Sequence, residues 1–125
     1  MANPNIVNVT SIYGSTTYLI PSNTSATTWT ALTPASNVVN KVNNIVASNV
    51  TGSAVPVTVS INSATGGSGT AYRLAYQISV PANSSLIIVD KTTSFYVGDG
   101  QSVVVTVGTG SAIELTSAFE ALASS

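Results

Sequence analysis

The chain lacks both cysteine and histidine, and it is very poor in charge. Its 125 residues include only three basic and four acidic side chains, whereas about a quarter of an average soluble protein is charged. The absence of cysteine excludes disulfides, thiolate chemistry and cysteine-ligated zinc. Most enzymes position a histidine, a thiolate or a carboxylate beside a base, and this chain has little of that material. The composition therefore predicts a structural protein and not an enzyme, with no metal or other cofactor.

The charge balance and the apolar runs exclude two classes of partner. The net charge is −1, and nucleic-acid binding requires several lysines or arginines that displace counterions, so we expect no nucleic acid. No stretch approaches the roughly 18 apolar residues of a membrane helix, so we expect no membrane partner. The start, Met1–Pro4, lacks the basic segment and apolar run of a secretory signal, and we expect synthesis in the cytoplasm.

The dominant pattern is period-two alternation of apolar and polar residues, which predicts half-buried β-strands. Three runs show it most clearly, namely Val55–Ile61, Tyr72–Val80 and Val103–Val107. In the second run one face is expected to hold Tyr72, Leu74, Tyr76, Ile78 and Val80. Further strands rich in β-branched residues are predicted at Ile6–Tyr13, Tyr18–Ile20, Thr28–Leu32, Lys41–Asn49, Leu86–Val89, Phe95–Val97 and Ala112–Leu115.

Turn residues separate these runs and indicate the fold class. The stretch Asn62–Thr70 contains three glycines and predicts a long flexible hairpin tip. The segment Thr116–Ala123 fits a helical face or a frayed last strand equally well. Short strands at spacings of about 8–12 residues indicate a sandwich or barrel. We therefore expect an all-β chain, with residues 1–125 as a single jelly-roll-like β-sandwich of about eight short antiparallel strands.

The N-terminal segment, residues 1–13, is apolar and β-prone but contains Pro4. An unpaired strand of this kind needs a cover. It is either an edge strand of its own domain or an arm that pairs with a neighbouring subunit. Ile6 and Val9 are therefore candidate interface residues.

Aromatic residues are few, with one Trp, five Tyr and two Phe, and most fall at positions expected to face the core. Tyr13, Tyr18 and Trp29 cluster in the irregular N-terminal third, and such side chains are enriched at interfaces; packing in the core is the alternative. Arg73, the only arginine, lies on the polar face of its run. It is either an anchor between subunits or a solvated side chain.

Three patterns resemble sites of known chemistry, and each has a simpler explanation. Asp99, with only Asp90 nearby in sequence, supplies too few oxygens for calcium, which takes 6–8, and is expected to cap its own turn. The glycine-rich loop lacks the lysine and following helix of a phosphate site. Glu114 and Glu120 form a carboxylate pair of the glycosidase type without the aromatic cleft that such enzymes need.

Several segments together resemble the small β-structured virion proteins of tailed bacteriophages, especially those of cyanobacteria. They are Asn5–Gly14, Ile45–Asn49, Val57–Ile61, Tyr72–Leu74, Ile78–Leu86 and Phe95–Ser102. The resemblance covers most of the chain as a succession of strands and turns, and it contains no catalytic signature. It implies a particle component such as a capsid decoration (cement) protein, located in the virion.

These expectations define a function and two alternatives. The expected function is decoration of a capsid through contacts with the major capsid protein or other virion proteins. The alternatives are a neck or tail accessory protein, and a carbohydrate- or receptor-binding module. A mean hydropathy of +0.40 with so few charges favours a homo-oligomer, and analogy with head decoration proteins suggests a trimer.

Overall fold

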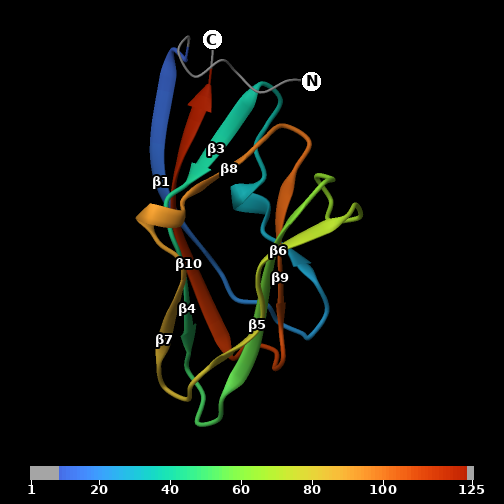
Figure 1. Ribbon diagram of the computed structural model, residues 1–125, viewed down its shortest axis with the longest axis vertical. Coiled ribbons are helices and arrows are strands. Elements are labelled where there is room, and N and C mark those ends of the chain that lie inside the picture. Colours follow the sequence, from blue (N-terminus) through green and yellow to red (C-terminus); the bar gives the residue numbers. More distant parts are fainter. Residues whose placement is uncertain (1–8, 124–125) are drawn as a thin grey trace.

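The computed structural model describes residues 9–123, which form two antiparallel β-sheets (Figure 1). The six-stranded sheet contains β1 (Ser11–Leu19), β3 (Val38–Val42), β4 (Ile45–Asn49), β7 (Ser85–Val89), β8 (Phe95–Val97) and β10 (Ile113–Ala123). The four-stranded sheet contains β2 (Thr27–Thr28), β5 (Val55–Asn62), β6 (Ala71–Val80) and β9 (Ser102–Val107). Two short 3-10 turns are η2 (Thr30–Leu32) and η3 (Lys91–Thr93). The all-β sandwich is thus confirmed, with ten strands in the described residues, of which β2 and β8 are very short.

The long strand β10 organises the six-stranded sheet. Its first half pairs with β4 and its second half with β3, while β1 pairs along its other side. In turn β4 pairs with β7, and β3 pairs with β8. The sheet is therefore four strands wide. Strand β1 forms one edge and β10 lies next to it. Strands β3 and β4 follow one another along the other side of β10, and β8 and β7 form the second edge.

The predicted strand Lys41–Asn49 is broken in the middle, between β3 and β4. The backbone N–H of Asn43 donates to the carbonyl of Ala118 at 2.9 Å. The next partner is a side chain, because Asn44 Oδ1 accepts from the N–H of Ala118 at 2.9 Å. An asparagine side chain thus takes the place of a backbone carbonyl, and the chain bends without leaving a donor of β10 unpaired.

The core lies between the two sheets and consists mainly of valine. In β5 and β9 the valines predicted to face inward are buried against the opposite sheet. The alternation does not hold throughout, because Ser102 and Val104 on the other face of β9 are also buried, and in β5 Ser60 and Asn62 are buried while Ile61 is half-buried. The fully buried residues of these strands include Val57, Val59, Val103 and Val105. Across the core they meet residues of the six-stranded sheet such as Val42, Ile45, Ile113 and Leu115.

The predicted strand Thr28–Leu32 is wrong beyond Thr28, because the chain turns there into η2. The N–H of Trp29 still bonds to Val103 O at 2.7 Å, and the N–H of Leu32 then bonds to Trp29 O at 3.1 Å. A 3-10 turn brings residues three apart onto one side. Trp29 and Leu32 consequently both enter the core.

The last strand settles the ambiguous segment Thr116–Ala123, which continues β10 and is not a helix. Its partner β1 pairs with it over nine consecutive positions. The separately predicted strands Ile6–Tyr13 and Tyr18–Ile20 are therefore replaced by one strand, because the intervening residues pair with β10 without interruption. Residues 1–8 lie outside the described residues.

The loop Asn62–Thr70 is anchored and not the free hairpin tip that its glycines suggested. The buried Asn62 side chain accepts from the N–H groups of Ala64 at 3.0 Å and Gly69 at 2.8 Å. It also donates to the carbonyls of Gly67 and Gly69. One side chain thus satisfies backbone groups at both ends of the loop.

Side chains of neighbouring strands hold the same loop against the four-stranded sheet. Thr28 Oγ1 donates to Gly66 O at 3.2 Å, and Ser102 Oγ donates to Ala64 O at 2.6 Å. Gly67 has φ +80°, and a Cβ there would lie 2.8 Å from Thr28 Oγ1. Only glycine fits at this position, because other residues are strained in that conformation.

Candidate assembly surface

All five tyrosines are exposed, with 46% to 76% of their surface accessible. This corrects the expectation that most aromatic residues face the core. Trp29 is buried, at 1% exposure, and Phe95 and Phe119 pack at the margin of the core. Since a tyrosine hydroxyl is already satisfied by water, these side chains need no partner inside the protein. The aromatic material of the chain is thus concentrated on its surface.

The strand register places an uncharged row of side chains across the outer face of the six-stranded sheet. Ile87 lies opposite Val46, Val46 lies opposite Thr116, and Thr116 lies opposite Tyr18. The two ends of the row, Ile87 and Tyr18, are strongly exposed. The row crosses the full width of the sheet, from β7 to β1. Such a surface loses little hydration when it is covered, because it carries no charge.

A second row on the same face carries Lys41 and Glu120, and a further charged residue of this face, Glu114, lies two positions before Thr116 on β10. Tyr96 lies opposite Lys41, Lys41 lies opposite Glu120, and Glu120 lies opposite Gly14. Lys41 and Glu120 have opposite charge at directly paired positions, an arrangement that stabilises a sheet modestly. Gly14 leaves the outer face of β1 open beside Glu120.

The edge strand β6 also exposes apolar side chains, contrary to the prediction that they share a buried face. The register with β5 shifts twice, so that Ala75 pairs with Val59 and Arg73 pairs with Ser60. Each shift is a β-bulge, which changes the face on which the following residues lie. Of the predicted face only Val80 is buried, while its exposed members are Tyr72, Leu74, Tyr76 and Ile78.

The candidate interface residues have diverse locations. Ile6 lies outside the described residues, and Val9 is half-buried just before β1. Tyr13 and Tyr18 are exposed on β1, and Arg73 is exposed on β6 with its guanidinium 5.1 Å from the Tyr76 ring centre. Trp29 is corrected to a core residue, because it is buried in the core cluster and offers no surface to a partner.

Register relationships, and not sequence proximity, identify the surface residues that sequence reasoning missed. Ile87, Val46 and Tyr96 come from three separate strands. Their runs were predicted as strands from the content of β-branched residues, without a pattern that gives the outward face, and only the pairing of the strands brings them into rows with β1. A sequence signal for them would require the strand order, which alternation does not provide.

The carboxylates of Glu114 and Glu120 lie too far apart for a pair of the glycosidase type. Glu114 and Glu120 lie on the same face of β10, about 20 Å apart at about 3.3 Å per residue. Glycosidase carboxylates lie within about 10 Å of each other. Asp99 accepts from the N–H of Asn37 at 3.2 Å. Among residues 9–123 no cluster of three or more acidic residues can hold a metal ion.

Asp90 has a structural role at the start of η3. Its Oδ1 accepts from Thr92 Oγ1 at 2.6 Å and from the N–H groups of Thr92 and Thr93. The N–H of Asp90 donates in return to Thr93 Oγ1 at 3.1 Å, which completes a capping box. The hydrogen bond from the Thr92 side chain is the main cause that lowers the pKa of Asp90.

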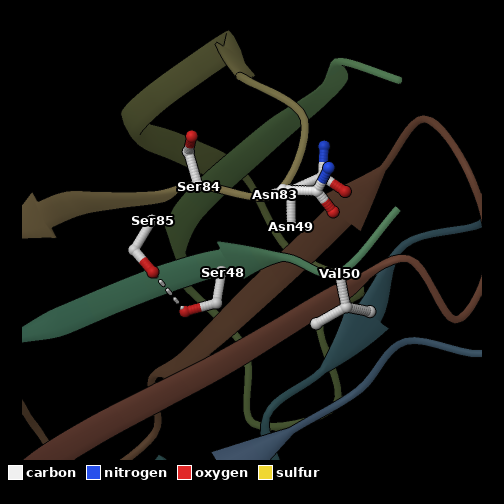
Figure 2. A pocket seen from close by; sticks show the side chains of 6 residues that line it. All are labelled: Ser48, Asn49, Val50, Asn83, Ser84 and Ser85. Carbon is white, nitrogen blue, oxygen red and sulfur yellow. Dashed lines mark hydrogen bonds between the residues drawn. The ribbon is translucent and has the colours of Figure 1, made fainter. Parts of the chain in front are cut away.

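A shallow polar hollow lies at the end of β4, with a volume of about 410 Å³ (Figure 2). Its lining consists of Ser48, Asn49, Val50, Asn83, Ser84 and Ser85. Figure 2 shows that Ser48 and Ser85 point toward each other, and their hydroxyl oxygens are 2.8 Å apart. Asn49 donates internally to Ser53 O and Val80 O. Ser48, Asn49 and Ser85 thus use their polar groups within the protein, and the hollow offers few convergent groups to a ligand.

No family model matches the chain, and no curated protein matches it. Among solved structures, the chain is similar to a Bacillus endospore appendage protein, described as belonging to a novel family of disulfide-linked pili. The identity is 19%, the match covers 91% of this chain and 88% of that chain, and the TM-score is 0.47. Within residues 9–123, no helix has the length and apolar character needed to span a membrane.

Proposed function

We propose that this chain is a structural subunit of a bacteriophage particle, which decorates or cements the capsid shell through non-covalent contacts with the major capsid protein. The observation that carries the proposal is the uncharged row from Ile87 to Tyr18 across the outer face of the six-stranded sheet. The resemblance to small virion proteins supports the choice of particle. No catalytic step is part of the proposal.

A row of side chains without charge can be covered by a partner at a low desolvation cost. Covering a charged group requires a partner charge or a large desolvation cost. The row from Ile87 to Tyr18 consists of tyrosine, aliphatic and hydroxyl side chains, so contact with a neighbour along this row removes apolar area at little cost. Ion pairs contribute little to such contacts, and we expect attachment to tolerate changes in salt.

Binding to purified particles that lack the protein tests the proposal. We expect wild-type protein to bind such shells, and Tyr18→Lys with Ile87→Lys to bind at least about tenfold more weakly, a loss of about 1.4 kcal/mol. Both side chains are exposed, so the fold is expected to be unchanged. A matched control is Thr65→Lys, which adds a charge on an exposed loop residue away from the row. Equal binding by all the variants would contradict a role for this row.

The neck or tail accessory function is the first alternative within the same class. It uses the same kind of surface, but the copies would form a small ring at one vertex and not a cover over the head. Imaging of labelled particles separates the two, because the label marks either the whole shell or one point on it.

A carbohydrate- or receptor-binding module is the second alternative, and the exposed tyrosines favour it. Aromatic faces stack on sugars, and Tyr18 and Tyr72 are both strongly exposed. A glycan array with wild-type protein and with Tyr18→Ala and Tyr72→Ala variants tests this function. Glycan binding that depends on either ring would replace the proposal of capsid decoration.

A further inference from the structure

We propose that β1 pairs with β1 of a second copy of this chain, in an antiparallel arrangement across a two-fold axis. The inference concerns contacts between copies of the chain and does not rest on the particle proposed above. It follows from a comparison of the free edges of the two sheets and from the direction of the backbone groups on β1.

Three of the four sheet edges carry features that prevent strand pairing. The edge strand β2 has only two residues. The edge formed by β7 and β8 is interrupted by η3, where Asp90 and Lys91 add charge. The edge strand β6 has two register shifts, and Gln77 within it has φ 49°. Short strands, charges and bulges are the usual means by which proteins protect sheet edges.

The fourth edge, β1, carries none of these features. Its nine residues pair with β10 from Ser11↔Ala123 to Leu19↔Leu115 without a register shift. It contains no charged residue and no proline, and three of its side chains, Ile12, Tyr13 and Tyr18, are large, apolar or aromatic, and exposed. A long, regular and exposed edge of this kind is a template for another strand.

Hydrogen bonds on the far side of β10 show which groups of β1 face outward. The N–H of Asn43 bonds to Ala118 O, and the N–H of Val50 bonds to Ala112 O. The backbone N–H and C=O groups of even-numbered residues of β10 therefore point toward β3 and β4. Those of odd-numbered residues point toward β1, because the direction of these groups alternates along a strand. The odd-numbered residues of β10 pair with the odd-numbered residues of β1. The backbone groups of Ile12, Gly14, Thr16 and Tyr18 consequently face the free edge.

Among the sheet edges formed by residues 9–123, only another β1 can accept these groups over the full length of the strand. In the antiparallel register centred on Ser15, Ile12 lies opposite Tyr18 of the second copy, and Gly14 lies opposite Thr16. All four outward-facing residues then exchange hydrogen bonds, roughly eight in total at two for each bonded pair. No like charges meet, because β1 has no charge.

This register also joins the apolar surfaces of the two copies. Side chains at even positions of β1 lie on the outer face of the sheet, where Tyr18 ends the row from Ile87. Across the two-fold axis Tyr18 meets Ile12, and Ile12 lies opposite Leu122 within its own sheet. Aromatic and β-branched side chains at directly opposite positions stabilise a strand pair. Because the interface uses the same strand twice, it closes at two copies.

Sedimentation equilibrium of the full chain tests the inference. We expect wild-type protein to reach twice its monomer mass of 12.6 kDa. Thr16→Pro removes only an outward-facing N–H, so it is expected to remain folded by circular dichroism and to sediment as a monomer. Ser15→Pro is the matched control, because it removes a hydrogen bond to β10 and is expected to destabilise the fold itself.

A charge-exchange pair tests the register without a backbone change. Ile12→Lys with Tyr18→Lys places like charges opposite each other at both ends and is expected to weaken the dimer about tenfold or more. Ile12→Lys with Tyr18→Glu places opposite charges there and is expected to keep the dimer.

Four results would overturn the inference: a wild-type monomer at all concentrations, a trimer or larger mass, a Thr16→Pro dimer, or equal dimer affinity in the two charge variants. If residues 1–8 cover β1 in their own chain, wild type stays a monomer and their deletion produces the dimer, which also contradicts the proposal. Should Thr16→Pro fail to fold, the charge variants decide. The same masses test the trimer suggested by analogy.

Discussion

Asn62 Oδ1 accepts a hydrogen bond from the N–H of Gly69 at 2.8 Å, across seven residues of loop. The same side chain makes three more hydrogen bonds to loop backbone. We expect Asn62→Ala to lower the free energy of unfolding by about 2–3 kcal/mol, because several partly buried backbone groups lose their partner at once. Ser63→Ala, which removes one exposed hydrogen bond to Thr70 N, is expected to cost less than about 1 kcal/mol. Urea unfolding of both variants measures the difference, and equal values would show that the loop is not held by Asn62.

Two buried serines are expected to respond in opposite ways to removal of their hydroxyl group. Ser117 is fully buried, and its Oγ has no hydrogen-bond partner among the described residues. Ser102 is equally buried, but its Oγ donates to Ala64 O at 2.6 Å. Ser117→Ala is expected to leave stability unchanged or raise it by about 1 kcal/mol, and Ser102→Ala to lower it by about 1–2 kcal/mol. Thermal melts compare them, and a loss of similar size in both would contradict the prediction.

The Asp90 cap makes stability depend on acid pH. Its folded-state pKa is lowered, mainly by the hydrogen bond from the Thr92 side chain. The cap therefore stabilises the fold fully above the unfolded pKa, about 3.9, and this contribution disappears as the pH falls through the lower folded value. Between pH 5 and 8 we expect constant stability, because the chain has no histidine or cysteine.

Thermal melts from pH 2 to 8 check this dependence. Below pH 4 the melting temperature of Asp90→Asn is expected to decrease less than that of the wild type. If the melting temperature of the variant decreases with acid pH as much as that of the wild type, Asp90 does not contribute to the decrease.

The bulges of β6 give a prediction about Gln77, whose φ is 49°. Its N–H bonds to Thr58 Oγ1 at 2.9 Å instead of to the strand ladder. A β-branched residue is strongly disfavoured in this conformation, so Gln77→Val is expected to cost about 1–2 kcal/mol. Gln77→Gly is expected to stay within about 0.5 kcal/mol, since the relief of strain offsets the added chain entropy.

Ser79 provides the matched control for this prediction. It lies on the same strand at a regular paired position, where valine favours and glycine disfavours the strand. We expect Ser79→Val to be more stable than Ser79→Gly, whereas Gln77→Gly is expected to be more stable than Gln77→Val. Denaturation midpoints of these four variants measure both orders. The same order at both positions would mean that the backbone at Gln77 is ordinary.

The fold class was predictable because alternation depends only on neighbours in the sequence. Val57 and Val59 both face the core because alternate residues of a strand lie on the same face of the sheet. The same reasoning failed for Leu74 and Tyr76, because two bulges in β6 change the phase of the alternation. A bulge depends on the partner strand, and no local residue pattern marked it.

The break between β3 and β4 and the row of side chains on the outer face could not be predicted from local sequence patterns either. The interruption at Asn44 depends on its contact with Ala118, 74 residues away. The row that joins Ile87 to Tyr18 depends on the order of four strands. The sequence identified Tyr18 as an interface candidate from its type alone, and this remains a prediction until a partner is tested.

Imaging of intact particles, with the chain located by a label, tests the central claim of a capsid-decorating structural subunit most directly. We predict many copies spread over the outer surface of the head, with the outer face of the six-stranded sheet against neighbouring protein. Copies confined to one vertex would favour the neck or tail alternative, and absence of the chain from the particles would contradict the account.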